Sequence, residues 1–441
     1  MRIAVAFALL ASCLAAAARG DEKPAAEKNW PQWRGPLGTG VSPEGDPPVE
    51  FSETKNVRWK TALPGKGHST PVVWGEHIFV TAAARVGDKL EKPFYSGRPG
   101  AHDNLPVTHR YDYFVLAVNR GTGKIRWRKS LNQLVPEEGA HYTASLASAS
   151  AVTDGEHVLA HFGSAGLFCL DFDGDLVWKS ELGQMQTKHG HGEGSGPALY
   201  GDTVLVNWDH EGDSFIVALD KRSGKQRWRK RRDEVTSWST PLIIEHDGKP
   251  QAIVSGSNRV RGYDLATGEV LWECGGLAQN IVASPVYGNG MVFVGSSYEK
   301  RSLLAIRLAE AKGDIAETEN VAWRRMRGTP YVPSPLLYGE TLYFLTHYQA
   351  ILTGVDAATG EDAPGAMRLD GLRNIYASPV GASDRIYVTD LDGMTAVISH
   401  GEKPKLLALN RLNDSFAASA AIVGGELFLR GEKFLYCIAE D

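Results

Sequence analysis

The chain has 441 residues and a formal net charge of −5, with a sequence pI near 6.2. This slightly acidic balance does not support a nucleic-acid partner, which would require a basic surface. The length exceeds that of a usual single domain, yet no linker-like stretch divides the chain beyond its N-terminal segment.

The first 20 residues predict export. Met1-Arg2 is followed by an apolar run that ends in alanines, the pattern of a secretory signal peptide. Leu10-Ala11-Ser12-Cys13 also fits a bacterial lipobox, in which Cys13 is acylated; the alternative is ordinary cleavage near Ala18 or Gly20, with Cys13 discarded. We expect a periplasmic or outer-membrane-associated protein of the cell envelope, or a secreted one. Only a lipidated Cys13 would attach it to a membrane.

Residues 21–55 form an N-terminal segment with two parts. Residues 21–28 are polar and alanine-rich, which predicts a tether. Residues 30–36 read W-P-Q-W-R-G-P, which could plug one end of a channel or pack along a blade edge. A structural role is favoured, because buried tryptophans usually serve packing.

From residue 56 onward the chain repeats itself eight times, and three independent features give the same number. One is an apolar strand opened by Pro or Ala, at Pro71, Ala151, Pro197, Pro241, Pro285, Pro335, Pro379 and Ala420. Another is the strand that follows it, at residues 77–81, 157–161, 203–207, 251–255, 291–295, 341–345, 385–389 and 426–430. The third is a small residue before a turn, at Ala117, Cys169, Ala218, Gly262, Ala305, Gly354, Ala396 and Cys437.

Repeats of this length built only from strands predict an all-β, eight-bladed β-propeller over residues 56–441. Most repeats end in a tryptophan, and we expect the small residue to leave room for a tryptophan from the next blade. The closing tryptophans are Trp59, Trp127, Trp178, Trp228, Trp272 and Trp323. The eighth repeat lacks its outer strand, and residues 56–63 resemble the missing piece. This N-terminal strand is therefore predicted to complete the last blade and close the ring.

The repeat resembles the pyrroloquinoline-quinone (PQQ)-type propeller repeat, with its A-x-D-x-x-T-G-x-x-x-W docking motif. Residues 260–272 read V-R-G-Y-D-L-A-T-G-E-V-L-W, and the endings G-K-I-R-W, G-D-L-V-W and G-K-Q-R-W precede it. The resemblance implies the fold shared by the eight-bladed quinoprotein dehydrogenases and the BamB-type outer-membrane assembly lipoproteins. It implies an activity only weakly. Repeats six and seven depart from the motif, since Thr359-Gly360-Glu361 leads to no Trp.

Unusual side chains are predicted to gather on one face of the ring. An insert at residues 82–112 falls between the second and third strands of the first repeat, and loops of that kind open on the same face as the loops before the inner strands. The candidate ligand-binding residues on this face are His68, His141, His189, His191, Glu193, Asp209, His210, Trp238, Arg259, Asn280, Tyr331, His347, Tyr376 and Asp390.

Two kinds of cofactor are considered for this face, and neither is assigned. His189 and His191 are candidate metal ligands, with Glu193 continuing the series; alternatively, they bond backbone carbonyls in a glycine-rich loop. The resemblance to quinoprotein dehydrogenases implies PQQ held between a coplanar Trp and a disulfide of adjacent cysteines, with calcium bound by Glu, Asn and Asp. No two cysteines are adjacent here, and Cys169, Cys274 and Cys437 are expected to be free, buried thiols.

The sequence therefore favours a noncatalytic cell-envelope propeller that binds a protein partner or a ligand through its His- and aromatic-lined face, as a BamB-like scaffold would. The alternative is a PQQ-dependent dehydrogenase-like or metal-assisted enzyme acting at the same face. No G-x-S-x-G elbow, P-loop or H-E-x-x-H motif supports another chemistry.

Overall fold

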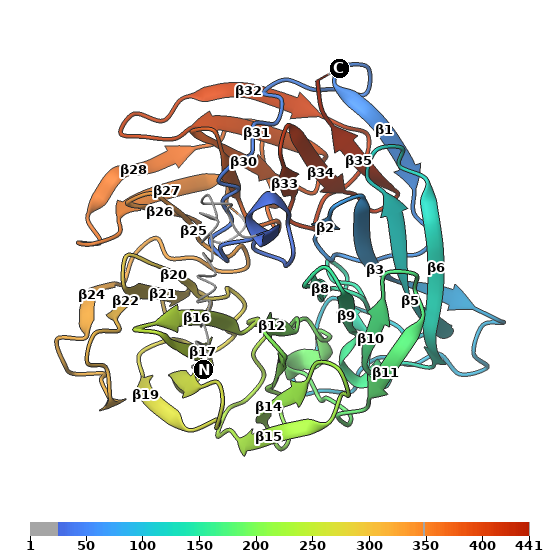
Figure 1. Cartoon of the computed structure of the whole chain (residues 1–441), viewed down its shortest axis with the longest axis horizontal. Helices are drawn as coiled ribbons and strands as arrows, with labels where there is room; N and C mark the ends of the chain where they lie inside the picture. Colours follow the sequence, from blue (N-terminus) through green and yellow to red (C-terminus); the bar gives the residue numbers. More distant parts are fainter. Residues whose placement is uncertain (1–24, 347–348, 441) are drawn as a thin grey trace, which may run out of the picture.

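The computed structural model describes residues 25–346 and 349–440, and its strands form eight blade sheets arranged around a central channel, with one further two-stranded sheet in the insert region (Figure 1). Each blade has four antiparallel strands, and in every blade but the fourth the shortest strand lies innermost. The predicted eight-bladed propeller is confirmed. Within the described residues, no helix is long and apolar enough to cross a membrane.

The blades follow one another in chain order. Blade 1 contains β2 (Val72–Trp74), β3 (His77–Val86), β5 (Arg110–Asn119) and β6 (Ile125–Leu134). Blade 2 contains β8 (Val152–Thr153), β9 (His157–His161), β10 (Leu167–Asp171) and β11 (Leu176–Ser180). Blade 3 contains β12 (Ala198–Tyr200), β13 (Thr203–Trp208), β14 (Phe215–Asp220) and β15 (Gln226–Arg231). Blade 4 contains β16 (Leu242–His246), β17 (Lys249–Val254), β18 (Val260–Asp264) and β19 (Val270–Cys274), and β23 (Gly313–Asp314) joins its outer edge.

The second half of the ring has the same plan. Blade 5 contains β20 (Val286–Gly288), β21 (Met291–Ser296), β22 (Ser302–Arg307) and β24 (Val321–Arg325). Blade 6 contains β25 (Leu336–Tyr338), β26 (Thr341–Leu345), β27 (Ile351–Asp356) and β28 (Asp362–Arg368). Blade 7 contains β29 (Val380–Ala382), β30 (Arg385–Thr389), β31 (Met394–Ser399) and β32 (Leu406–Arg411). Blade 8 contains β33 (Ala421–Val423), β34 (Glu426–Arg430), β35 (Phe434–Ile438) and the N-terminal β1 (Val57–Ala62).

The two ends of the chain close the ring in blade 8. Strand β1 pairs antiparallel with β35, and Trp59 lies opposite Cys437. The predicted closure is therefore confirmed. It leaves the last blade with a paired outer strand, so that β35 is not an open edge.

Blades are joined by what we call the tryptophan belt, which explains the T-G-x-x-x-W pattern. In each joint a tryptophan of one outer strand lies against a turn glycine of the next blade, and its indole N–H donates to a carbonyl of that turn. The pairs are Trp59 with Gly123, Trp127 with Gly174, Trp178 with Gly224, Trp228 with Gly268, and Trp323 with Gly360. The accepting carbonyls belong to Arg120, Phe172, Lys221, Leu265 and Ala357, at 2.6–2.9 Å.

Glycine is required in these turns for two reasons. Gly224 has φ +67°, a conformation that side-chain-bearing residues rarely adopt, and a Cβ there would lie 2.6 Å from the Trp178 ring. The turn itself is held by a side chain, since the Asp220 carboxylate accepts from the N–H and the hydroxyl of Ser223.

The small residues have a different neighbour from the predicted one. In every blade that has a closing tryptophan, the small residue lies directly across the strand pair from that tryptophan, as Ala117 does with Trp127 and Ala218 with Trp228. The expectation that a tryptophan of the next blade fills the slot is therefore wrong. At Gly262 a Cβ would lie 2.3 Å from Trp272 Nε1, so the slot makes room for the blade's own indole.

Three blades depart from the belt. Trp272 turns onto its own blade, where its Nε1 is 3.3 Å from Gln251 Oε1, because the next blade lacks the T-G turn. Blade 6 pairs Gly354 with Gly365, and blade 7 pairs Ala396 with Leu409. The last two departures follow the motif losses seen in the sequence.

A ring of hydroxyl groups joins the blades at the channel. In most blades a Ser or Thr stands just before the Pro or Ala that opens the inner strand, and its hydroxyl accepts from the backbone N–H of the equivalent residue in the preceding blade. The bonds run from Thr70 to Ser150, Gly196 to Thr240, Thr240 to Ser284, Ser284 to Ser334, Ser334 to Ser378, and Ser378 to Ser419, at 2.8–2.9 Å. These bonds satisfy backbone donors that no strand partner reaches.

The N-terminal segment enters the channel and then crosses to the rim (Figure 1). Trp30 pairs with Val73 of β2, and the buried Arg34 guanidinium donates to the carbonyls of Pro335 and Pro379. Burial lowers the pKa of Arg34 to about 9. The chain then passes blades 7 and 8, where the Phe51 N–H donates to Asn410. Of the two roles considered for residues 30–36, the first fits their position, because they lie in the channel. We call residues 30–36 the plug.

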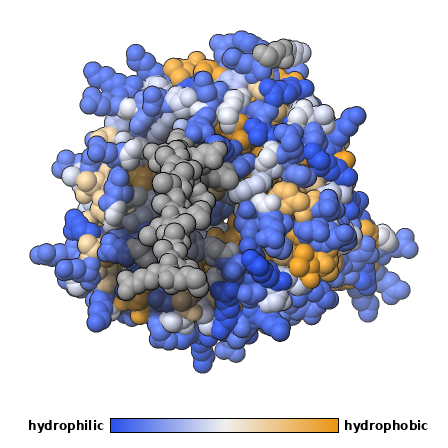
Figure 2. All heavy atoms as spheres, viewed as in Figure 1, coloured by the Kyte–Doolittle hydropathy of each residue, from blue (hydrophilic) through white to orange (hydrophobic). Residues whose placement is uncertain are grey.

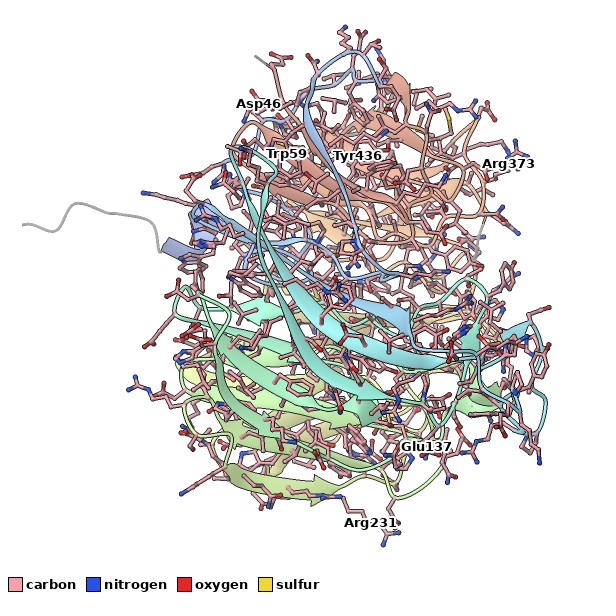
Figure 3. The ribbon with its side chains drawn as sticks, turned by 90° about the vertical axis from the view of Figure 1, so that its right-hand side faces the viewer. Asp46, Trp59, Glu137, Arg231, Arg373 and Tyr436 are labelled. Carbon is pink, nitrogen blue, oxygen red and sulfur yellow. The ribbon has the colours of Figure 1, made fainter. Side chains whose placement is uncertain are left out.

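The insert lies on the opposite side of the ring from Asp46 of the N-terminal segment (Figure 3). Strands β3 and β5 extend far enough for Val86 to pair with Arg110, and beyond them β4 (Asn104–Leu105) pairs with β7 (Ala140–His141). The three cysteines of the described chain are free and buried, as expected.

Candidate functional site

A cavity of about 290 Å³ opens at the channel mouth on the insert side of the ring. Its walls come from the loops before the inner strands, from the insert and from the N-terminal segment. Eight of the candidate residues line it: His68, His141, His191, Glu193, Trp238, Asn280, Tyr331 and Tyr376. We call this cavity the mouth pocket.

The floor of the mouth pocket combines the hydroxyl ring with the plug. Ser150, Thr240, Ser378 and Ser419 of the ring line the pocket. Trp33 lines it too, and its Nε1 lies 3.3 Å from the Ser419 hydroxyl. The plug therefore closes the channel below the mouth pocket, so that the pocket is open at one end only.

One side of the mouth pocket is aromatic. Tyr298 and Tyr331 stack with ring centroids 5.7 Å apart and planes inclined by 18°. Trp238 is held by a 2.7 Å hydrogen bond from its Nε1 to the Gly192 carbonyl. Tyr376 adds a further ring to the wall. Such surfaces bind flat or apolar faces of ligands.

The other side carries histidines. His102 of the insert lies with its ring centroid 4.7 Å from that of His191 and 6.3 Å from that of His141. His141 and His191 are 4.9 Å apart, and His189 is 5.3 Å from His191. We call these four residues the histidine cluster. The sequence placed His189 and His191 together, and the structure adds His141 and His102 to them.

Burial decides the charge of several of these rings. Burial, together with the neighbouring histidines of the cluster, lowers the pKa of His191 to about 4. Burial also lowers the pKa of His141, and it lowers that of His68 to about 3, with Lys66 and Arg430 adding to the shift. These three imidazoles are neutral at pH 7.

Glu193 is the one acidic residue among the described residues that line the mouth pocket. Its carboxylate accepts from the backbone N–H and the hydroxyl of Ser164, at 2.6 and 2.5 Å. Burial nevertheless raises its pKa to about 7, because desolvation outweighs the two hydrogen bonds.

Two buried polar atoms on the wall have no hydrogen-bond partner within the described structure. They are Asn280 Oδ1 and His191 Nε2. Asn280 also has φ +59°, a conformation that costs free energy unless the surroundings enforce it. Unsatisfied buried polar atoms are costly, so each is a natural partner for a ligand group.

Four candidates lie away from the mouth pocket and have structural roles. Asp209 forms a buried ion pair with Arg232 at 2.7 Å. His210 Nδ1 accepts from the Gln186 N–H, Asp390 accepts from the N–H groups of its own loop, and Arg259 pairs with Asp314 at the rim. None of these four lines the mouth pocket, and each polar group is used within its own blade or loop or with its neighbours. His347 lies outside the described residues.

Three ring-bearing residues of the site, His102, Trp33 and Tyr298, were not among the candidates. His102 lies in an insert without a repeat equivalent, and Trp33 lies in a segment whose place depends on tertiary packing. The H-D-N sequence around His102 and the second Trp of W-P-Q-W-R-G-P were the available signals, but neither fixes a position on its own.

The residues of the mouth pocket do not fit PQQ with calcium. PQQ carries several carboxylates, yet no Lys or Arg is among the described lining residues, and Glu193 is the single acidic one. No adjacent-cysteine disulfide stands over the pocket, since the described cysteines are free and buried elsewhere. A polyanion and a hard cation would both lack partners here.

Fold and site together define an eight-bladed β-propeller with a plugged channel and a binding pocket at its mouth. The family model described as "Outer membrane protein assembly factor BamB" matches residues 112–363 and 216–433, and the chain belongs to this family. No curated protein matches the sequence at a significant level.

Solved structures show the same fold at low identity. The chain is similar to BamB from Moraxella catarrhalis, with 14% identity, 81% of this chain and 100% of that chain covered, and a TM-score of 0.55. It is also similar to the computationally designed Ika8 protein (11% identity, 81% and 100% covered, TM-score 0.54). The quinohemoprotein alcohol dehydrogenase from Comamonas testosteroni is a further neighbour (11% identity, 94% and 81% covered, TM-score 0.50). Such identities establish the fold and no activity.

Proposed function

We propose that this protein is an exported, noncatalytic propeller of the cell envelope that binds a small neutral ligand in the mouth pocket. The observation that supports this most is the pairing of an aromatic wall with unsatisfied polar atoms above a closed floor. The expected ligand class has one flat apolar face and a rim of hydroxyl groups, as a sugar residue does.

Each part of that ligand would meet a matching surface. Its C–H face would lie against Trp238 or the stacked Tyr298 and Tyr331, where dispersion and burial favour it. Its hydroxyl groups would donate to Asn280 Oδ1 and His191 Nε2 and exchange hydrogen bonds with the hydroxyl ring. A neutral ligand is favoured because the wall histidines His68, His141 and His191 are uncharged at pH 7.

The acidic content of the mouth pocket favours binding over hydrolysis. Glycoside hydrolysis ordinarily uses two carboxyl groups that flank the bond to be cleaved. Among the described lining residues Glu193 has no second carboxylate beside it, and both its oxygens accept from Ser164.

Export and envelope location are part of the proposal. They rest on the apolar pattern of residues 1–20, which lie outside the described residues, and on membership of the BamB family. Cell fractionation with intact mass spectrometry tests them. A mature N-terminus at Cys13 with added acyl mass would support a lipoprotein, an unmodified N-terminus near residue 20 would support a soluble exported form, and a full-length cytoplasmic chain would contradict export.

Ligand binding is tested by titrating the purified protein with a panel of neutral sugars while recording tryptophan fluorescence, since Trp33 and Trp238 both line the mouth pocket. We expect saturable binding by at least one sugar, and its loss in Trp238→Ala. Tyr200→Ala, on the exposed side of β12, serves as the control and should bind as the wild type does. A panel that gives no saturable signal would contradict the proposed ligand class.

A protein partner is a second candidate, favoured by exposed apolar side chains around the insert. Tyr95 is 66% exposed, Tyr142 56% and Leu105 48%. Leu105 and Tyr142 lie close together, because β4 pairs with β7 and the Tyr142 N–H donates to the Asp103 carbonyl. Figure 2 views the ring from the side opposite the insert, and that face is mostly hydrophilic with separate hydrophobic areas.

Site-specific photo-crosslinking in cells tests this second candidate. A crosslinker at Tyr95 or Tyr142 should give a discrete adduct with one envelope protein, and a crosslinker at Tyr200 should not. Equal, diffuse labelling at all three positions would count against a partner at the insert.

A further inference from the structure

The histidine cluster draws on three separate segments of the chain. His102 comes from the insert, His141 from β7, and His189 and His191 from the loop around the short helix η3 (Lys188–Gly190). Backbone contacts hold these segments together. The His141 N–H donates to the His191 carbonyl, and Asn104 Nδ2 donates to the His189 carbonyl at 2.8 Å. The four rings are therefore brought together by tertiary structure, because no helix or single strand aligns them.

Hydrogen bonds fix the tautomer of two rings. His102 Nδ1 lies 2.8 Å from the Gly100 carbonyl, and His189 Nδ1 lies 3.0 Å from the Pro99 carbonyl. A carbonyl oxygen can only accept, so each Nδ1 carries the hydrogen and each Nε2 keeps a lone pair. Metal-binding histidines are commonly oriented by this kind of bond. His191 contributes a buried Nε2 without a partner in the described structure.

The backbone around the histidine cluster has an unusual conformation. His189 has φ +58°, a left-handed value that is uncommon outside glycine. A Cβ on Gly100 would lie 2.6 Å from His189 Nδ1, and a Cβ on Gly190 would lie 2.3 Å from Ser96. The loops therefore approach more closely than side-chain-bearing residues would allow. Such conformations persist where the surrounding structure enforces them, and they are typical of binding sites.

We propose that His102, His141, His189 and His191 bind one divalent first-row transition ion of the kind that prefers imidazole, such as zinc or copper. Four imidazoles around one ion, with metal–nitrogen bonds of about 2.0–2.1 Å, place their ring centres roughly 5 Å apart. The ring centroids that surround His191 are 4.7, 4.9 and 5.3 Å from it, while His102 is 5.5 Å from His189 and 6.3 Å from His141, so the rings must move closer together to share one ion.

Binding requires rotation of the rings about their side-chain bonds, and His141 must also give up the 3.4 Å hydrogen bond that its Nδ1 accepts from the Thr143 N–H, because this bond places the hydrogen on Nε2. In the described residues, the one group of three donors whose ligand atoms all lie within 4.8 Å of one another is Asp154, Glu156 and His157. That group is not a metal-site candidate, because Asp154 already holds the Lys221 ammonium group. The histidine cluster has no such cation among its contacts, and its oxygen-poor donor set excludes calcium and magnesium.

A bound ion would tie the insert to the channel rim beside the mouth pocket. His102 is exposed on the insert, whereas His141 and His191 belong to the pocket wall. The ion would be held by protein ligands alone, so its binding does not require a sugar in the pocket. An ion on His191 Nε2 would take the place of the sugar hydroxyl proposed for that atom, so the sugar titration is done with metal-free protein.

The test is isothermal titration calorimetry of the tag-free mature protein with Zn²⁺ near pH 7.5, with Mg²⁺ as the control ion. We expect one Zn²⁺ site per chain and no Mg²⁺ signal. His102→Ala and His191→Ala should each weaken Zn²⁺ binding by at least about tenfold. The matched control is His109→Ala in the same insert, whose ring contacts Thr108 and lies outside the cluster, and it should bind as the wild type does.

Two further measurements distinguish loss of a metal ligand from unfolding of a variant. Melting temperatures without metal show whether a variant is folded; His102 is exposed, so that variant should stay folded even if His191→Ala does not. The visible spectrum of the Co²⁺-loaded protein should show intense d–d bands that disappear in His102→Ala. Absence of Zn²⁺ binding, unchanged affinity in both cluster variants, or loss of binding only in Asp154→Asn would each overturn the proposal.

Discussion

The tryptophan belt and the mouth pocket are both rich in aromatic residues, but they use them in opposite ways. In the belt each indole is packed against a glycine of the next blade and donates to a carbonyl at a repeated place. In the mouth pocket Trp238 and Tyr376 each stand three residues before the Pro that opens an inner strand, Trp33 comes from the N-terminal segment, and all three face a cavity. Aromatic residues on the outer strands therefore hold the ring together, and those that precede the inner strands are available for binding.

The belt should be far more sensitive to truncation than the pocket. Trp178 is buried between blades 2 and 3, so Trp178→Ala should lower the free energy of unfolding by about 3–5 kcal/mol, because it leaves a cavity and the unpaired Lys221 carbonyl. Chemical denaturation monitored by circular dichroism measures the change. A loss below about 1 kcal/mol would show that the belt is not what joins the blades.

Alanine substitutions at two glycines distinguish the stability contributed by the indole contact from the cost of backbone strain. Gly268 and Gly248 have φ +72° and +69°, but a Cβ would lie 2.6 Å from the Trp228 ring at Gly268 and meet nothing within 4 Å at Gly248. Alanine should cost about 1–2 kcal/mol at Gly248 through strain, and about 1–3 kcal/mol more at Gly268 through overpacking. Equal losses in the two denaturation curves would mean that the indole contact adds nothing.

Glu193 makes the free energy of unfolding depend on pH, which the tryptophans and glycines of the tryptophan belt do not. Its folded pKa of about 7 exceeds the unfolded value of 4.5, so its contribution to stability is present below pH 4.5 and is lost as pH rises through 7. Glu193→Gln cannot ionise, and it should gain stability relative to wild type between pH 5 and 8, by at most about 3 kcal/mol. Parallel stability curves for the two proteins over this range would contradict the buried, titrating carboxyl group.

Truncation in the mouth pocket should have the smallest effect on stability. Trp238 borders the cavity and donates one hydrogen bond, to the Gly192 carbonyl, so Trp238→Ala should cost only about 1–2 kcal/mol. The same variant should lose sugar binding, which Trp178→Ala should retain under conditions where it is folded. Melting curves and fluorescence titrations of both variants test this prediction. Greater destabilisation in Trp238→Ala, or loss of sugar binding in folded Trp178→Ala, would contradict it.

The contrast between the tryptophan belt and the mouth pocket also explains why the fold could be predicted from the sequence more fully than the site. Repetition made the fold predictable, because Pro71, Ala117 and Trp127 each have equivalents around the ring and a single error would not change the count. Closure by β1 was predictable for the same reason, since Trp59 occupies the place of a closing tryptophan.

The site was only partly predictable, because some of its residues lie outside the repeat. His68, His191 and Trp238 stand before inner strands, where the repeat itself fixes the face, and they were placed correctly. Asp209 occupies an equally plausible loop but pairs with Arg232, a contact set by tertiary geometry that no spacing reveals. His102 and Trp33 lie in segments outside the repeat, so their positions depend on how the insert and the plug fold back onto the ring.

A crystal structure of the protein soaked with the tightest-binding sugar of the panel tests the account most directly. We predict sugar density in the mouth pocket, with its apolar face on Trp238 or on the stacked Tyr298 and Tyr331, and with a hydroxyl group bonded to Asn280 Oδ1. Density on the outer blade edges with an empty channel mouth would contradict it.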